Sequence, residues 1–193
     1  MKILLTTTAA IAATLAVVAP AAAQRVPAAN IAVVDTSRVT TECTACRAAS
    51  AALQGQVTAL RTRQQQLAAS LQGEGTAIQT AVNALNGKQP DATLTARIKA
   101  VQAKEEAANQ ELQRGQQQIQ RNQQYVLQQI GTKLTPVIQQ VMDRRGANLV
   151  IDASASLKAA PALDVTNDVL AGLNAALPSV STTAPAAAAP TRR

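Results

Sequence analysis

Two cysteines, Cys43 and Cys46, form a Cys-x-x-Cys pair, and they are the residues whose type and spacing could do chemistry. In a thiol oxidoreductase such a pair lies at a helix start that lowers the pKa of one thiol, while the second thiol resolves the mixed disulfide. Zinc is the other chemistry to consider, but a structural zinc site takes four ligands. The chain has no further cysteine and no histidine, so the pair cannot complete such a site by itself.

The context of the pair favours a structural role. It follows the apolar run IAVVD but lies in no strand–helix–strand pattern, and no nearby Trp or Pro resembles a thioredoxin-type active site. We therefore expect no catalytic, cofactor-binding or metal-binding residues. A disulfide is expected instead, either locally between Cys43 and Cys46, which we favour, or between neighbouring chains.

The first 23 residues predict export. They contain one cation at Lys2, an apolar run from about Ile3 to Val18, and small residues at Ala21 and Ala23 in an A-x-A arrangement. This pattern is typical of a secretory signal peptide, cut after Ala23. No later run is long enough to cross a membrane, so the product is expected to be soluble and exported.

The composition argues against one compact core. Hydrophobic residues make up 47% of the chain, but many are alanine, and Tyr125 is its one aromatic residue. Helices that bury narrow stripes in an elongated or oligomeric molecule fit this composition better. The formal net charge is +7, yet no basic cluster is interleaved with aromatics, so nucleic acid is excluded as a partner.

The middle of the chain predicts two long helices. From about Ser37 the pattern becomes helical, and apolar residues then recur at alternating spacings of four and three, which is typical of a coiled-coil seam. The segment NGKQPD at 86–91 breaks the first helix, and Asp91 can cap the second. The predicted seam comprises Leu53, Val57, Leu60, Leu67, Leu71, Ile78, Leu85, Leu94, Ile98, Val101, Leu112, Ile119 and Val126.

Folding the second helix back on the first gives an antiparallel hairpin in which Leu85 meets Leu94 and Leu53 meets Val126. The same register predicts three weak layers. In these layers Val57 lies opposite Asn122, Gln64 opposite Gly115, and Glu74 opposite Glu105. A two-helix arm with such layers is expected to bend and splay.

Both flanks of this arm predict a small body. IAVVD and NLVID read as buried strands, SLKAAPAL as a short third strand, and Gly146 ends the second long helix. A closing helix capped by Asp164 or Thr166 follows. One chain has too few strands to bury its own sheet, so the bodies are expected to associate. The predicted body core comprises Ile31, Val33, Val34, Leu149, Val150, Ile151, Val169 and Leu173.

These elements give an α+β fold that is mostly α, with a small strand-containing body and a long helical hairpin arm. The Pro/Ala-rich end of the chain is expected to be disordered. The expected division is a signal peptide at 1–23, a body at 24–36 and 142–177, an arm at 37–141 with its tip at 86–91, and a disordered tail at 178–193.

The body motifs IAVVDTSRV, GANLVIDAS and LDVTNDVLAGLN resemble the OmpH family of periplasmic chaperones, over residues 30–177. The resemblance implies a homotrimer with a central β body and three helical arms. It also implies that the arms hold unfolded outer-membrane proteins in the periplasm without ATP. The cysteine pair is not a general feature of that family.

The arm differs from the family pattern in being rich in Gln rather than Lys. Residues 53–127 contain eight cations and five anions, a net charge of +3, so only weak contact with an anionic membrane surface is expected. Two other functions remain open on the sequence alone. One is a periplasmic coiled-coil spacer that binds no unfolded protein, and the other is thiol oxidoreductase activity at Cys43 and Cys46.

Overall fold

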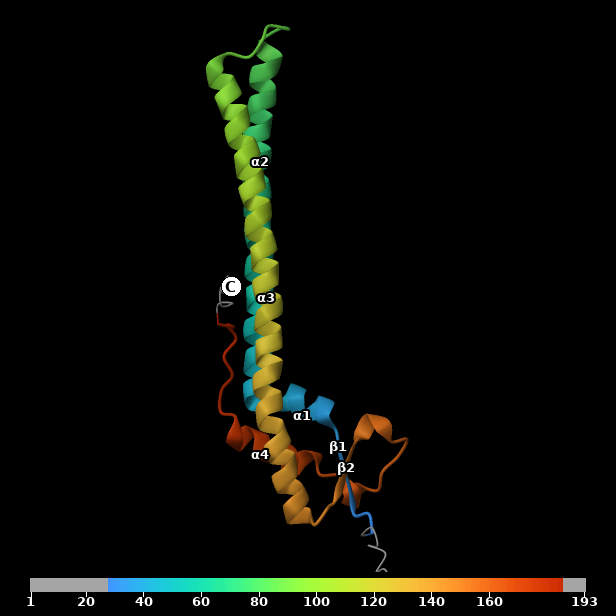
Figure 1. Cartoon of the computed structure of the whole chain (residues 1–193). Coiled ribbons are helices and arrows are strands. Elements are labelled where there is room, and N and C mark those ends of the chain that lie inside the picture. Colours follow the sequence, from blue (N-terminus) through green and yellow to red (C-terminus); the bar gives the residue numbers. More distant parts are fainter. Residues whose placement is uncertain (1–27, 186–193) are drawn as a thin grey trace, which may run out of the picture.

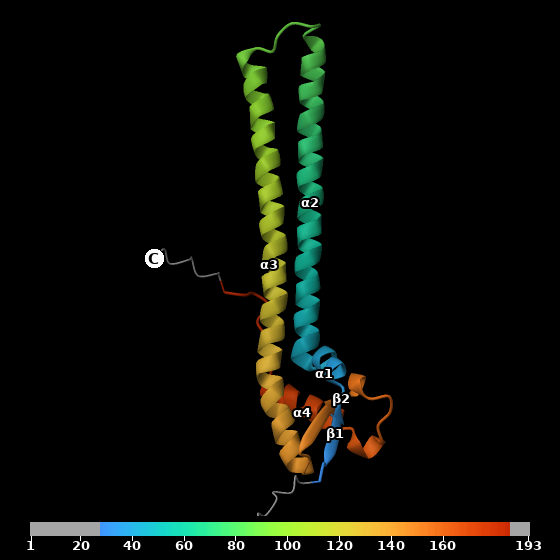
Figure 2. The same ribbon diagram turned by 45° about the vertical axis from the view of Figure 1, so that its right-hand side comes forward.

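The computed structural model describes residues 28–185. A long helical hairpin rises from a small body that both flanks of the hairpin build (Figures 1 and 2). This arrangement confirms the predicted fold class, which is mostly α with a small strand-containing body. The predicted signal peptide, residues 1–23, lies outside the described residues.

Helices α2 (Thr44–Ala84) and α3 (Ala92–Arg145) form the hairpin. The tip turns through Asn86 and Gly87, whose φ angles of 47° and 86° are positive, a region that glycine adopts without steric cost. Asp91 caps α3, since its Oδ1 accepts a 2.7 Å hydrogen bond from the Leu94 amide. At the other end of α3, Gly146 adopts the left-handed conformation with φ 65° and ends the helix, as predicted.

Most of the predicted seam positions are shielded from solvent. Of these positions only Val57 is exposed, at 42%, and the others are buried or half-buried. The weak layers differ in detail from the expectation. Gly115 faces Leu60 rather than Gln64, Asn122 bonds Gln56 rather than facing Val57, and Glu74 pairs with Lys104. A side chain in such a seam enters a gap between residues of the facing helix, so opposing one residue to one is too simple.

The sequence predicts one helix from about Ser37, but the structure has two helices in this region. Helix α1 (Thr36–Glu42) ends at Cys43, whose extended ψ of 144° separates it from α2. Helix α1 packs against the closing helix α4 (Thr166–Ala176), so it belongs to the body. The arm therefore begins at Thr44, because the cysteine pair turns the chain there.

Two parallel strands form the sheet of the body, β1 (Ile31–Val34) and β2 (Leu149–Asp152), in the register Ile31 to Leu149. The predicted third strand is wrong for this chain. The segment after β2 contains two short 3-10 turns, η1 (Ala153–Ala155) and η2 (Pro161–Leu163), and pairs with the sheet through a single bridge from Asp164 to Val33. Pro161 has no amide hydrogen to donate to a strand ladder, which explains why η2 forms instead.

Helix α4 closes the body over the base of α3. Val169 and Leu173 of α4 are fully buried, as is Val34 of β1. Strand β2 is less covered, with Val150 and Ile151 half-buried and Leu149 43% exposed. One face of the sheet is therefore packed within the chain, while β2 keeps apolar surface open to a partner.

The expectation of disorder from residue 178 does not describe residues 178–185. These residues leave α4 and run beside the lower part of the hairpin (Figures 1 and 2). Ser181 and Ala184 are hydrogen-bonded to Gln129 and Asn122 of α3. The composition of the tail predicts that it cannot form its own core, but composition cannot show that the arm supplies partners for its backbone.

Candidate functional site

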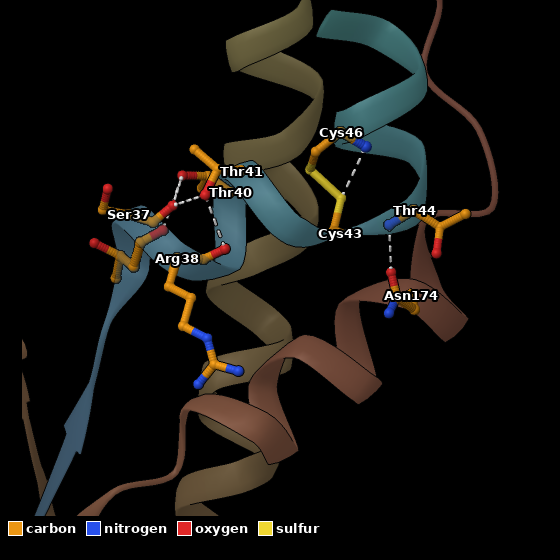
Figure 3. Close-up of a disulfide and its surroundings, with 9 residues drawn as sticks. Ser37, Arg38, Thr40, Thr41, Cys43, Thr44, Cys46 and Asn174 are labelled. Carbon is orange, nitrogen blue, oxygen red and sulfur yellow. Dashed lines mark hydrogen bonds between the residues drawn. A yellow bond between two sulfur atoms is a disulfide. The ribbon is translucent and has the colours of Figure 1, made fainter.

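The cysteine pair lies at the joint between body and arm. Cys43 and Cys46 form a disulfide with Cα atoms 5.0 Å apart, and the Cys43 sulfur accepts a 3.0 Å hydrogen bond from the Cys46 amide (Figure 3). Next to it, the Thr44 amide donates to Asn174 of α4 at 2.8 Å. The pair thus stands at the N-terminus of α2 and holds that terminus to the body.

Access to these sulfurs is poor. Cys43 is 0% exposed and Cys46 is 4% exposed. Redox catalysis needs a thiol that a substrate disulfide can approach in line, so this burial disfavours the oxidoreductase hypothesis. Residues 28–185 contain no cluster of three or more His, Cys, Asp or Glu side chains that could hold a metal ion.

One face of the hairpin carries a shallow groove. Its lower part, about 440 Å³, lies beside the disulfide, and its upper part, about 410 Å³, continues towards the tip. The two parts share Val57 and Gln123, so they form one surface. We call this surface the arm groove. It is lined by Thr40, Thr41, Cys46, Ser50, Leu53, Gln54, Val57, Leu60, Arg61, Gln64, Leu112, Gln116, Ile119, Gln120, Gln123, Val126, Leu127 and Ile130.

The chemistry of the arm groove is unspecific. Its floor is aliphatic, and Val57 and Leu127 are 42% and 64% exposed. Its rim is mostly glutamine amide, which both donates and accepts hydrogen bonds. Such a surface can accept apolar side chains of many shapes but has no converging charged groups to select one ligand.

Charges on the arm are partly neutralised across the hairpin. Arg63 donates to Glu111 at 2.7 Å, and Lys104 donates to Glu74 at 2.6 Å. The hydrogen bond from Arg63 lowers the pKa of Glu111 and keeps it ionised. Because these pairs are solvent-exposed, they contribute little to stability, and they involve two of the eight cations between residues 53 and 127.

The second candidate surface is the outer side of the body. Leu149 on β2 is 43% exposed, Leu163 is 38% exposed, and Leu157 projects fully into solvent. The strand order β1–β2 leaves β2 paired on one side only. An open strand edge with an exposed leucine, Leu149, is a surface for association with another chain.

A third surface was missed by the sequence analysis. Gln56, Asn122 and Gln129 bind the main chain of residues 181–184. Nothing in the periodicity distinguishes these amides from the other glutamines of the arm. The one signal is that Asn122 is a polar residue at a seam position, where it is 4% exposed and needs hydrogen-bond partners.

Within residues 28–185, no helix is both long enough and apolar enough to span a membrane. No curated protein matches the chain. Among solved structures, the chain is similar to one from Caulobacter crescentus CB15, described as an OmpH-like outer membrane chaperone. The TM-score is 0.69 at 21% sequence identity, over 81% of this chain and 90% of that one, so this likeness concerns the fold.

The family model for the outer membrane protein (OmpH-like) family matches residues 30–173. That range runs from the residue before β1 to the last buried leucine of α4 and includes the whole hairpin. The match therefore covers the body and the arm together and excludes residues 178–185. On this evidence the chain belongs to the OmpH-like family.

Proposed function

We propose that the protein is an ATP-independent periplasmic holdase chaperone that binds unfolded outer-membrane proteins and prevents their aggregation. The observation that carries this proposal is the arm groove, an exposed aliphatic floor with a rim of glutamine amides. Unfolded chains expose apolar side chains and unpaired backbone groups, and this surface offers partners to both. No catalytic residue is needed for such an activity.

The family and the fold support this class of function. The solved structure from Caulobacter crescentus, which shares the fold, is described as an outer membrane chaperone. The leader expected at residues 1–23 supports a periplasmic location. The net charge of +3 over residues 53–127 supports at most weak contact with an anionic membrane surface.

The functional unit in this proposal is a homotrimer. A single hairpin presents the arm groove to open solvent and cannot enclose a client. The open edge of β2, where Leu149 is exposed, supports association through the body. Three bodies joined in this way would bring three arms around one space.

The test is dilution of a urea-unfolded outer-membrane barrel protein into buffer with increasing amounts of the purified chain. Light scattering reports aggregation, and native mass spectrometry reports the complex. We expect aggregation to stop at about one client per trimer, and a trimer mass that gains one client. A chain that forms oligomers but leaves the scattering unchanged would be a structural spacer instead.

A matched pair of variants assigns the activity to the groove. Val57→Gln changes an exposed valine in the arm groove, whereas Val82→Gln changes an exposed valine of α2 near the tip. Losing part of one valine contact is worth about 1 kcal/mol, so client affinity should fall about fivefold in Val57→Gln alone. Equal affinities in the two variants would place client binding outside the groove.

A further inference from the structure

We propose that Gln56, Asn122 and Gln129 form a site that binds an extended polypeptide backbone, and that the chain's own residues 181–184 occupy it. The inference rests on the proposed function, because the competing ligand is an extended segment of an unfolded client. The tail then acts as an internal occupant that clients displace.

The arm side chains form hydrogen bonds with the main chain of the tail. Gln129 makes two of them, since its Nε2 donates to the Ser181 carbonyl at 2.9 Å and its Oε1 accepts from the Ser181 amide at 3.1 Å. Gln56 Nε2 donates to the Thr182 carbonyl at 3.0 Å. Asn122 Oδ1 accepts from the Ala184 amide at 2.8 Å. Each of these bonds is available to almost any sequence in an extended conformation, because none uses a tail side chain.

The site is held in place by its own hydrogen bonds. Asn122 is 4% exposed, and its Nδ2 donates to Gln56 Oε1 at 2.8 Å. Gln118 Nε2 donates to Asn122 Oδ1 at 2.8 Å, which fixes the amide from the other side. Gln129 Nε2 also donates to the Tyr125 carbonyl at 3.1 Å. These bonds within the arm restrict the amides to orientations that face the tail, which lowers the cost of ordering them on binding.

The tail is a weak occupant. Exposure alternates along residues 181–185, with Thr182 and Ala184 half-buried and the residues beside them exposed. The half-buried side chains are small, so little apolar area is gained beyond the backbone bonds. What keeps the tail bound is its attachment, because Leu177 and Val180 pack on the body and place the next residues at high effective concentration.

The tail and the arm groove lie on different faces of the hairpin. The residues that bind the tail do not line the groove, whereas Gln123 and Leu127, their neighbours on α3, do. A client whose apolar side chains occupy the groove can thus reach the tail site with an adjoining extended segment. A client bound in the groove then presents its extended segment to the tail site at high effective concentration, and so competes with the attached tail on equal terms.

The first test is a truncation after Val180, which removes residues 181–193 and keeps the packing of Leu177 and Val180. Affinity for an unfolded barrel protein should rise about fivefold or more, since removing an occupant at about millimolar effective concentration frees the site. A synthetic peptide of residues 178–185 should bind the truncated chain in trans, detected by NMR shifts of glutamine side-chain amides, and should bind the full chain far less.

A second variant keeps the chain length. Ala184→Pro removes the amide hydrogen that donates to Asn122 Oδ1. Thr183→Pro removes an amide hydrogen that donates only within the tail, to Ser181 Oγ at 3.4 Å. Ala184→Pro should raise client affinity, and Thr183→Pro should not. In the truncated chain, Gln129→Ala should reverse the gain, whereas Gln110→Ala, at an exposed glutamine bonded only to Glu106, should leave it.

The outcomes separate the two proposals. If the full chain prevents aggregation but the truncation and Ala184→Pro leave affinity unchanged or lower it, the tail only braces the arm, and the internal-occupant inference is wrong. If no form of the chain holds a client, the holdase proposal fails. In that case binding of the 178–185 peptide to the truncated chain still decides whether the backbone-reading site exists.

Discussion

At the scale of single residues, the most chemically suggestive pair in the chain stabilises a joint. The disulfide between Cys43 and Cys46 closes a short loop at the turn from α1 to α2, and Cys43 caps α2. Closing so short a loop is worth about 2 kcal/mol on chain-entropy arguments. Its contribution lies in fixing where the arm leaves the body.

The variant Cys43→Ser with Cys46→Ala tests this role. The serine hydroxyl at position 43 can still accept a hydrogen bond from the amide of residue 46, and alanine fits the buried position 46. The main loss is therefore the cross-link. We expect the free energy of unfolding, measured in urea, to fall by about 2 kcal/mol, with aggregation suppression unchanged. If the folded variant no longer held clients, the cysteines would have a direct functional role.

A second residue-scale prediction concerns Asp152, at the end of β2. Its carboxylate accepts hydrogen bonds from the side chain and amide of Ser154 and from Thr36, and these bonds hold its pKa well below the ordinary value. The unfolded chain therefore binds a proton that the folded chain does not as the pH falls below about 4. The contribution of Asp152 to the free energy of unfolding is fully present above that pH and is lost as the pH falls further.

Urea unfolding at pH 7 and pH 3 measures this effect. The wild type should lose more stability between the two pH values than Asp152→Asn does. The asparagine variant should already be less stable at pH 7, because it donates where the carboxylate accepts. An equal pH dependence in both chains would assign the acid sensitivity to other groups, such as Asp164, whose pKa is also lowered by its bonds to Thr166.

At the scale of elements, two helical glycines differ in whether a side chain would fit at their positions. A Cβ on Gly172 of α4 would lie 2.8 Å from Cγ1 of Val137, a buried and β-branched side chain of α3. A Cβ on Gly73 of α2 would meet nothing within 4 Å. The first glycine is thus required by the contact between α4 and α3, and the second only weakens its helix.

Gly172→Ala should lower the free energy of unfolding by about 1–3 kcal/mol, because overpacking forces Val137 or the helix to move. Gly73→Ala should raise helix stability by up to about 1 kcal/mol. Thermal unfolding followed by circular dichroism compares the two. A stabilised Gly172→Ala would mean that α4 is free to shift on α3.

At the scale of the whole molecule, the exposed side of the body predicts self-association. If β2 pairs with another chain, the midpoint of thermal unfolding should rise with protein concentration. Leu149→Glu places a charge on that edge and should reduce the native mass to one chain, whereas Val82→Glu, at the tip end of α2, should not. A wild-type chain that remains single at all concentrations would contradict the trimer proposal.

Prediction from the sequence worked where one local rule decides. Asp91 and Gly146 bound α3, and the β-branched runs locate β1 and β2. It did less well where the outcome depends on a distant partner. Gln56 and Asn122 are 66 residues apart in the chain, on opposite sides of the tip, and only the hairpin brings their amides to 2.8 Å.

The sequence by itself determined the existence of the hairpin, the small body and the family motifs, because periodicity, caps and β-branched runs act over a few residues. The periodicity did not show the turn at Cys43 or the absence of a third strand, although the cysteine pair and Pro161 lie in the segments concerned. Tertiary structure alone decided the path of residues 178–185. That path depends on hydrogen bonds between segments far apart in the chain, as in the bond from Ala184 to Asn122. Local patterns carry no record of such partners, which is why the tail site became visible only in the folded molecule.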